Sequence, residues 1–202
     1  MKTIAIVDYG VGNLKSVSNA LAYLGLNPLI TGDAGEIEGA DALILPGVGA
    51  FPAGADKLRE TGLDRAVIRQ AGRKPVLGIC LGMQLLFDWG EEGRRCAGLG
   101  LIHGRVERIP TERKLPHIGW NSLSFPNPSP LFWGLDEGAY VYFVHSYCGC
   151  AAREEDVLAA AQYGPSVTAA VGRDGVYGCQ FHPEKSGETG LQILKNFGAF
   201  IS

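Results

Sequence analysis

Short apolar runs alternate with amphipathic segments along the first 90 residues of the chain. Four of these runs are bounded by turn residues, as buried strands are, and they cover residues 3–7, 27–31, 42–45 and 75–79. Segments with apolar positions at helical spacing follow several of them, at 16–24, 58–70 and 81–87. A chain that alternates strand and helix in this way predicts a parallel sheet with helices on both faces.

The pattern changes towards the second half of the chain. Residues 89–98 carry loop signals, and strand-like runs separated by turn residues follow at 100–109, 117–125, 139–145, 157–163, 168–171 and 176–181. Their spacing favours antiparallel or mixed pairing, and an amphipathic helix is expected at 190–201. We therefore expect an α/β fold in one domain over residues 1–202, with a mostly parallel central sheet flanked by helices and an additional antiparallel or mixed portion.

Composition and charge narrow the class of protein. The 18 Lys and Arg residues against 21 Asp and Glu give a net charge of −3, and no stretch concentrates the basic residues, so nucleic acid is not expected as a partner. The first residues carry one charge and then a short apolar run ending at Asp8, which favours a first strand over a signal peptide. No apolar run approaches the roughly 18 residues of a membrane span. Five cysteines, an odd number, favour reduced thiols, so we expect a cytoplasmic protein without a membrane partner.

A cysteine stands where the fourth predicted strand meets a helix. Cys80 lies between Gly78 and Gly82 in the pattern G-x-C-x-G, which is the cysteine version of a nucleophile elbow. A thiol at the start of a helix faces unpaired backbone N–H groups and the helix dipole, and both favour the nucleophilic thiolate. The alternative is a small buried cysteine that fills a gap at a strand end, and the elbow alone does not choose between the two.

A cysteine nucleophile needs a base and a group that orients the base. His182 directly follows the last predicted strand, and Glu184 comes two residues later with Pro183 between them. In an extended segment, residues two apart project to the same side, so the carboxylate could bond one imidazole nitrogen and leave the other facing Cys80. A surface histidine beside an unrelated acid is the alternative interpretation of this short motif.

Backbone amides are the expected donors to an oxyanion. The turn Pro46-Gly47-Val48-Gly49 ends the third predicted strand, and its glycines allow N–H groups to point into a cavity. We therefore expect the Val48 and Gly49 amides, together with the Leu81 amide that follows the nucleophile, to form an oxyanion hole. An ordinary turn at a strand end would have the same composition.

Three blocks together resemble a known family. In this order along the chain, Pro46-Gly47-Val48-Gly49, Gly78-x-Cys80-x-Gly82 with Met83-Gln84, and Gln180-Phe181-His182-Pro183-Glu184 are similar to the class I, triad-type glutamine amidotransferases, whose fold is flavodoxin-like. Within that class, the blocks Asp8–Asn13 and Pro116–Asn121 resemble the glutaminase subunits of imidazole glycerol phosphate synthase, in histidine biosynthesis. The resemblance covers nearly the whole chain.

The resemblance implies a reaction and a set of residues. It implies that Cys80 attacks the side-chain amide carbon of L-glutamine, that His182 protonates the leaving ammonia and that Glu184 orients His182. A glutamyl thioester would form and water would release glutamate. The family's substrate positions match Gly47, Gln84, Glu92, His145, Ser146 and Tyr147, although His145 could instead be a core histidine. The family pattern implies neither a metal nor an organic cofactor.

The resemblance also implies a partner that uses the ammonia. That partner is a cyclase subunit of (β/α)₈ fold, which would form a heterodimer by docking over the catalytic face and would make imidazole glycerol phosphate and AICAR. The family places at this interface the residues that match Asn13, Trp120, Tyr142 and Lys185. A core position is the alternative for Trp120.

Two other functions remain open at this point. The same triad could serve a different synthase, of the anthranilate or pyridoxal phosphate type, or the chain could be a noncatalytic scaffold. The remaining cysteines add little. Cys148 and Cys150 resemble half of a metal site that no second pair completes, Cys179 fits a core position, and Cys96 has no assigned role.

Overall fold

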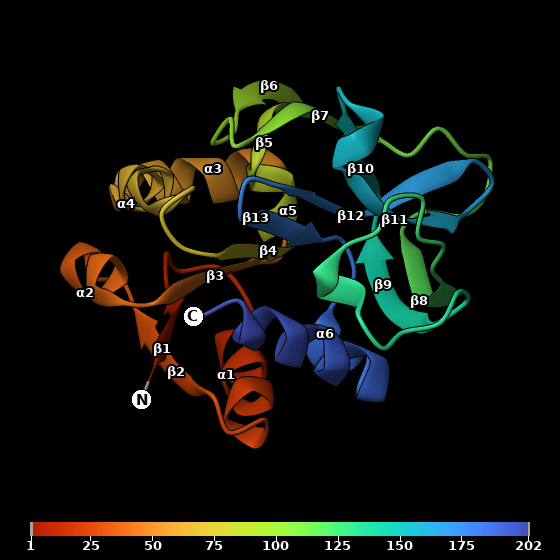
Figure 1. Ribbon diagram of the computed structural model, residues 1–202. Coiled ribbons are helices and arrows are strands. Elements are labelled where there is room, and N and C mark those ends of the chain that lie inside the picture. Colours follow the sequence, from red (N-terminus) through yellow and green to blue (C-terminus); the bar gives the residue numbers. More distant parts are fainter. Residues whose placement is uncertain (1, 202) are drawn as a thin grey trace.

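A seven-stranded sheet crosses the centre of the computed structural model, which describes residues 2–201 (Figure 1). Five strands are parallel and lie side by side in the order β2 (Asn27–Thr31), β1 (Thr3–Val7), β3 (Ala42–Gly47), β4 (Val76–Cys80) and β13 (Val176–Cys179). Beyond β13, the strands β12 (Ser166–Arg173) and β11 (Val157–Gln162) extend the sheet in antiparallel pairing. The order of the parallel strands is that of flavodoxin-like doubly wound folds. The predicted fold class is therefore confirmed.

Helices cover both faces of this sheet. The helices α1 (Leu14–Tyr23) and α6 (Gly187–Ala199) lie on one face, and α2 (Ala34–Gly39), α3 (Phe51–Glu60), α4 (Leu63–Gln70) and α5 (Leu81–Leu85) lie on the other (Figure 1). Successive residues of β1 alternate between the two cores, since Ile4 and Ile6 pack with α1 and α6 while Ala5 and Val7 pack with the opposite helices. No helix within residues 2–201 is long and apolar enough to cross a bilayer.

Two smaller sheets flank the central one. One has the order β10 (Tyr147–Ala151), β7 (Ile102–Arg108), β5 (Phe87–Glu92) and β6 (Arg94–Ala97). The other is an antiparallel pair of β8 (His117–Ser122) and β9 (Tyr140–His145), called the ribbon below. Single 3-10 turns stand at Pro130–Phe132, Glu154–Asp156 and Pro183–Lys185.

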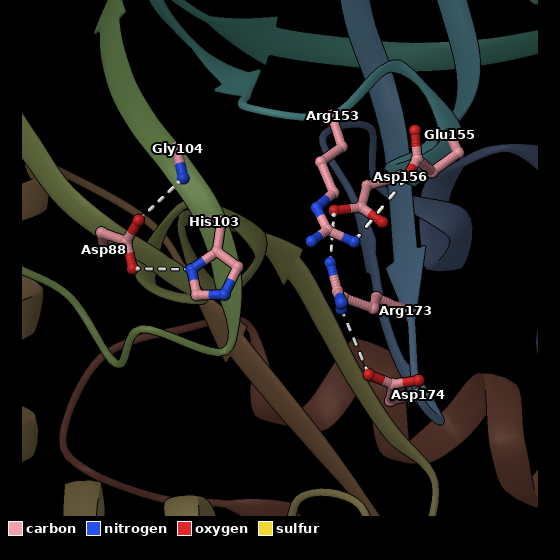
Figure 2. A network of polar contacts seen from close by, with 8 residues as sticks. All are labelled: Asp88, His103, Gly104, Arg153, Glu155, Asp156, Arg173 and Asp174. Carbon is pink, nitrogen blue, oxygen red and sulfur yellow. Dashed lines mark hydrogen bonds and ion pairs between the residues drawn. The ribbon is translucent and has the colours of Figure 1, made fainter.

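Polar contacts join neighbouring strands and turns in the four-stranded sheet and at the β11–β12 end of the central sheet (Figure 2). The Asp88 carboxylate on β5 accepts a 2.8 Å hydrogen bond from the Gly104 amide on β7 and lies 3.4 Å from a ring nitrogen of His103. This contact stands where the pairing register of β5 and β7 shifts. On β12, the Arg173 guanidinium lies 3.5 Å from the largely buried carboxylate of Asp156 and so holds the turn that precedes β11.

The prediction of a loop at 89–98 is wrong. These residues form most of the hairpin of β5 and β6, which turns at Gly93 with a left-handed φ of 73°. Charged residues such as Glu91 and Arg95 face each other across the hairpin and resemble loop composition in the sequence. The strand β10 also has no counterpart among the predicted elements. Pairing between strands supplies the order that local composition does not reveal.

The single helix predicted at 58–70 is also wrong. The structure has two helices there, α3 and α4, because the chain breaks at Gly62, whose φ of 71° lies in the left-handed region. Helix α3 begins already at Phe51, and α2 has no counterpart among the predicted helices.

Candidate active site

A cavity of about 380 Å³ opens beyond the carboxyl ends of β3 and β4. This is where ligands bind in open α/β sheets. Pro116 and Val144 contribute to its wall, together with ten of the residues singled out from the sequence: Val48, Gly49, Cys80, Leu81, Gln84, Glu92, His145, Ser146, Tyr147 and His182. These residues come from segments up to 134 positions apart in the chain, between Val48 and His182. The fold therefore brings most of the predicted site into one cavity.

Cys80 occupies a strained turn between β4 and α5. Its backbone has a φ of 55° and a ψ of −111°, which is unusual for a residue with a side chain and typical of a nucleophile elbow. A Cβ atom at Gly82 would lie 1.7 Å from the Leu45 carbonyl oxygen, and one at Gly78 would lie 2.6 Å from the Gly82 carbonyl oxygen. Both neighbours must therefore be glycine for this turn to close against β3.

His182 and Glu184 form a buried pair beside the thiol. The ring nitrogen Nδ1 lies 2.8 Å from Glu184 Oε1, and the two side chains are 2% and 1% exposed. The second ring nitrogen, Nε2, is buried and has no hydrogen-bond partner in the part of the chain that the structure describes. Burial lowers the pKa of His182, but the adjacent Cys80 thiol and the Glu184 carboxylate outweigh it and raise the pKa to about 9. The ring therefore holds a proton at neutral pH.

The expectation of an extended segment at 182–184 needs correction. His182 has extended backbone angles, but Pro183 begins a 3-10 turn, and the carboxylate returns to the ring from that turn. Ser186 fixes the turn, since its hydroxyl donates a 2.6 Å hydrogen bond to the His182 carbonyl and accepts one of 3.0 Å from the Tyr142 amide. The His182 amide in turn donates to the Tyr142 carbonyl at 3.0 Å. The ribbon thus holds the backbone of the histidine turn.

The loop after β3 forms another part of the cavity wall. Val48 and Gly49 line the cavity, and Gly49 has a φ of 97°. Tyr9, which was not singled out from the sequence, supports the loop because its buried hydroxyl donates a 2.8 Å hydrogen bond to the Pro46 carbonyl. Burial, followed by the nearby Cys80, raises the pKa of Tyr9, which keeps this proton in place. Gly47 is not among the residues that line the cavity, and a Cβ atom there would lie 2.5 Å from the Tyr9 hydroxyl oxygen and 3.0 Å from the Leu81 Cβ, so the position has no room for a side chain.

Gln84 points its amide nitrogen away from solvent. This nitrogen donates to the Tyr147 carbonyl at 3.1 Å and to the side-chain oxygen of Gln180 at 3.0 Å. Gln180, which is buried, then places its own amide nitrogen 3.8 Å from the Cys80 sulfur. Sequence reasoning assigned Gln180 no role. The available signal was its position two residues before His182 at the end of a buried strand.

The remaining wall combines an acid with the end of the ribbon. The Glu92 carboxylate accepts a 2.7 Å hydrogen bond from the Phe51 amide, which anchors it at the start of α3. His145 is buried and lines the cavity. Its Nδ1 lies 2.8 Å from the Tyr147 carbonyl. Ser146, between them, also lines the cavity.

The four residues assigned to a partner interface lie on or near the surface. Trp120 is 55% exposed, so a core position for it is wrong, and its ring packs edge-on against Tyr142 with 6.2 Å between ring centroids. Lys185 is exposed in the turn that carries Glu184. Asn13 is partly buried and immediately precedes α1.

Among residues 2–201, the structure shows neither a metal-binding cluster nor a disulfide. Among residues 2–201 no cluster of three or more His, Cys, Asp or Glu side chains could hold a metal ion. The five thiols are free, and Cys179 is buried in the core, as predicted.

Comparison with known proteins agrees with this geometry. The family described as "Glutamine amidotransferase class-I" matches residues 5–199. The protein of Geobacillus kaustophilus named "Imidazole glycerol phosphate synthase subunit HisH" is 53% identical, with 96% of this chain and 95% of the relative covered. The proteins of the same name from Caldanaerobacter subterraneus and Moorella thermoacetica are 50% and 48% identical, covering 98% and 100% of this chain and 98% and 96% of the relatives.

Solved structures support the fold independently. PurLQS from Thermotoga maritima aligns with a TM-score of 0.79 at 20% identity over 100% of this chain and 99% of that one. A crystal structure titled as a glutamine amidotransferase aligns with a TM-score of 0.75 at 22% identity, covering 96% of this chain and 98% of that one. At such identities the likeness concerns the fold alone. The site geometry, the family match and the full-length relatives lead to one conclusion: the chain belongs to the class-I glutamine amidotransferases and, among them, to the HisH family.

Proposed function

We propose that this chain hydrolyses L-glutamine to glutamate and ammonia, as the glutaminase subunit of imidazole glycerol phosphate synthase in histidine biosynthesis. The observation that carries the proposal is the convergence of three side chains in one cavity. The Cys80 thiol faces a buried imidazole whose other nitrogen is 2.8 Å from the Glu184 carboxylate. The relatives at about 50% identity carry the name of this synthase subunit over their full length.

The first half of the reaction needs a nucleophile, an acid and an oxyanion hole. Cys80 reacts as the thiolate that pairs with protonated His182: its sulfur attacks the side-chain amide carbon, and the carbonyl oxygen takes up negative charge. The backbone amides of Val48, Gly49 and Leu81 are the proposed donors to that oxygen. His182, protonated at neutral pH, gives its proton to the amide nitrogen as the C–N bond breaks, so that neutral ammonia and a glutamyl thioester result.

The second half uses the same groups in reverse. His182, now neutral, takes a proton from a water molecule as the oxygen attacks the thioester carbon. The carbon–sulfur bond breaks, the Cys80 thiolate and the protonated imidazole are restored, and the new carboxyl group loses its proton to solvent as glutamate leaves. Glu184 holds the ring in one orientation through both halves and stabilises its charged form.

Ammonia must reach a second site without becoming ammonium, because only the neutral molecule carries a lone pair for attack. We assign that site to a cyclase subunit of (β/α)₈ fold, bound as a heterodimer over the cavity in the cytoplasm, where free thiols persist. Trp120, Tyr142, Lys185 and Asn13 are its proposed contacts. Trp120 is exposed and packs edge-on against Tyr142, which suits an interface anchor, a role in which tryptophan is enriched.

Replacing the nucleophile tests the reaction. Cys80→Ala should abolish glutamine-dependent synthesis by the complex, by at least about 10⁴-fold, because no thioester can form. Synthesis from added ammonium should remain, since the second site does not use Cys80. Glutamate release and product formation would be measured for the chain alone and with a cyclase subunit. Equal loss of both activities would make Cys80 a structural residue, and activity only with another synthase would change the recipient.

Truncating the exposed tryptophan tests the partner. Trp120→Ala should weaken association with the cyclase subunit by about 30-fold or more, as hot-spot truncations do, and leave the melting temperature nearly unchanged. Isothermal titration and thermal unfolding measure the two effects. Trp133→Ala is a matched control, because Trp133 is 71% exposed and lies outside the proposed contacts. Unchanged affinity for the Trp120 variant would rule out the assigned surface.

A further inference from the structure

Two histidines link the ribbon to the wall of the cavity. The Asn121 side-chain nitrogen lies 3.3 Å from His117 Nε2, and His117 Nδ1 lies 3.1 Å from His145 Nε2. His145 Nδ1 lies 2.8 Å from the Tyr147 carbonyl. The histidines face each other across the ribbon, where they are paired in register. This chain of contacts runs from β8 into the cavity.

The direction of every hydrogen bond in the series from Asn121 to Tyr147 is fixed by the groups at its two ends. The Asn121 oxygen accepts from the Ser122 amide at 2.9 Å and its nitrogen donates to the Gln162 carbonyl at 2.9 Å, so the nitrogen is the atom that faces His117. At the other end, the Tyr147 carbonyl can only accept. One proton arrangement satisfies both ends, in which His117 and His145 are each neutral and each carry a hydrogen on Nδ1.

The surroundings keep both rings neutral. Burial, with a contribution from Arg113, lowers the pKa of His117, and burial lowers the pKa of His145 to about 4. The His117 ring is stacked between Phe143 and Tyr163, with 4.7 Å and 3.9 Å between ring centroids. The rings are therefore held in place as well as uncharged.

The series of hydrogen bonds continues from the Tyr147 carbonyl to Cys80. This carbonyl also accepts from the Gln84 amide at 3.1 Å, whose second hydrogen goes to the Gln180 oxygen at 3.0 Å. Gln180 then donates towards the Cys80 sulfur at 3.8 Å. Both amide hydrogens of Gln84 are thus in use, which leaves its oxygen as the group that can accept from a ligand in the cavity.

We propose that His117 is a positioning residue for the glutaminase site: by donating to His145 it fixes the His145 tautomer, the Tyr147 carbonyl and, through Gln84 and Gln180, the setting of the Cys80 sulfur. The proposal rests on the proposed function only for its activity readout. His117 lies three residues before Trp120 on β8. One strand therefore carries both the first histidine of the hydrogen-bond series and Trp120, a proposed contact with the partner.

Two substitutions separate hydrogen bonding from packing. His117→Phe keeps a flat ring between Phe143 and Tyr163 but removes the donor to His145. His117→Asn loses the stacking but places an amide N–H close to the position of the imidazole Nδ1. We expect His117→Phe to lower kcat/KM for glutamine about tenfold, the effect of one lost buried hydrogen bond, and His117→Asn to stay within about threefold of the original chain.

Nitrogen-15 NMR of the histidines in the full chain provides the second readout. The original chain and His117→Asn should show His145 protonated on Nδ1 alone, whereas His117→Phe should show a mixture of the two tautomers. His103→Phe is the matched control, because His103 is an exposed histidine near the start of β7 and does not line the cavity, and it should change neither activity nor the His145 signals.

The opposite pattern overturns the proposal. Full activity of His117→Phe with loss in His117→Asn would mean that packing alone is required, and so would an unchanged His145 tautomer in both variants. If the original chain with its cyclase subunit releases no glutamate, the proposed function fails, and the tautomer measurement still decides the positioning role.

Discussion

Two buried histidines on the same cavity have opposite acid–base properties. His182 and His145 are 2% and 6% exposed, and burial lowers the pKa of each. The pKa of His182 is nevertheless raised to about 9, whereas that of His145 is lowered to about 4. A difference in burial cannot explain this divergence.

The partners of each ring explain it. His182 has a carboxylate at one nitrogen and the Cys80 sulfur beside the other, and the negative charges of the carboxylate and the thiolate favour the charged ring. His145 has a carbonyl at one nitrogen and a neutral histidine at the other, and the nearby charge of His182 disfavours a second positive ring. The cavity thus holds one ring that can supply a proton and one that serves as an uncharged structural link.

Replacing Glu184, the carboxylate partner of His182, should have the largest effect on activity. Glu184→Gln should lower glutamine-dependent kcat by about 10³ to 10⁴-fold, because the ring loses its orientation and its charge stabilisation. Activity should fall above about pH 9 in the original chain, where His182 loses its proton, and this limb should move to lower pH in the variant. Steady-state rates from pH 6 to 10 measure both effects.

A neighbouring acid supplies the control for that experiment. Glu188→Gln makes the same chemical change at an exposed position in the first turn of α6. It should leave the rate and the pH limb unchanged. If Glu184→Gln leaves the limb in place, Glu184 does not set the protonation of His182.

The two rings should affect stability at opposite ends of the pH range. The unfolded chain binds a proton at His145 below about pH 6.5 and the folded chain does not, so the free energy of unfolding should fall by about 3 kcal/mol between pH 6.5 and 4. The stabilisation from the raised pKa of His182 is present below pH 6.5 and is lost as the pH rises to about 9. Urea unfolding across this range measures both slopes.

Substitution assigns the acid slope to one residue. His145→Gln should flatten the decrease between pH 6.5 and 4, whereas His103→Gln, at an exposed position, should keep it. An equally steep decrease in the His145 variant would show that other groups control acid unfolding.

The smallest expected effect comes from giving His117 a carboxylate partner, like the one that His182 has in Glu184. Asn121→Asp places a carboxylate where an amide now faces His117 Nε2 at 3.3 Å, so the pKa of His117 should rise by about one unit or more. An NMR titration of His117 measures the shift, and Asn127→Asp at a distant turn is the control. A pKa that stays below its ordinary value would show that burial outweighs an adjacent charge here.

The sequence predicts the parallel part of the fold well and its additions poorly. The bounds of β1 and β2 were correctly predicted, because short apolar runs flanked by turn residues have few alternatives. The hairpin of β5 and β6 and the break at Gly62 were missed. Both depend on pairing or on a left-handed residue that composition does not reveal.

The candidate site divides in the same way. The glycines around Cys80 and the two-residue spacing of His182 and Glu184 are local features, and the elbow and the 2.8 Å pair follow from them. Tyr9, Gln180 and His117 each lie in a block that carries the family resemblance, but they act on groups that lie 28 to 100 residues away, so local patterns did not reveal their roles.

The sequence by itself determined the α/β class, the elbow and the set of residues with the right chemistry. The tertiary structure decided which nitrogen each histidine offers and whether each ring holds a charge. The reason is physical, since proton affinity depends on the few atoms within hydrogen-bond reach, and packing between distant segments places those atoms. Two histidines on the same cavity therefore differ in proton affinity: the pKa of His182 is raised and that of His145 is lowered.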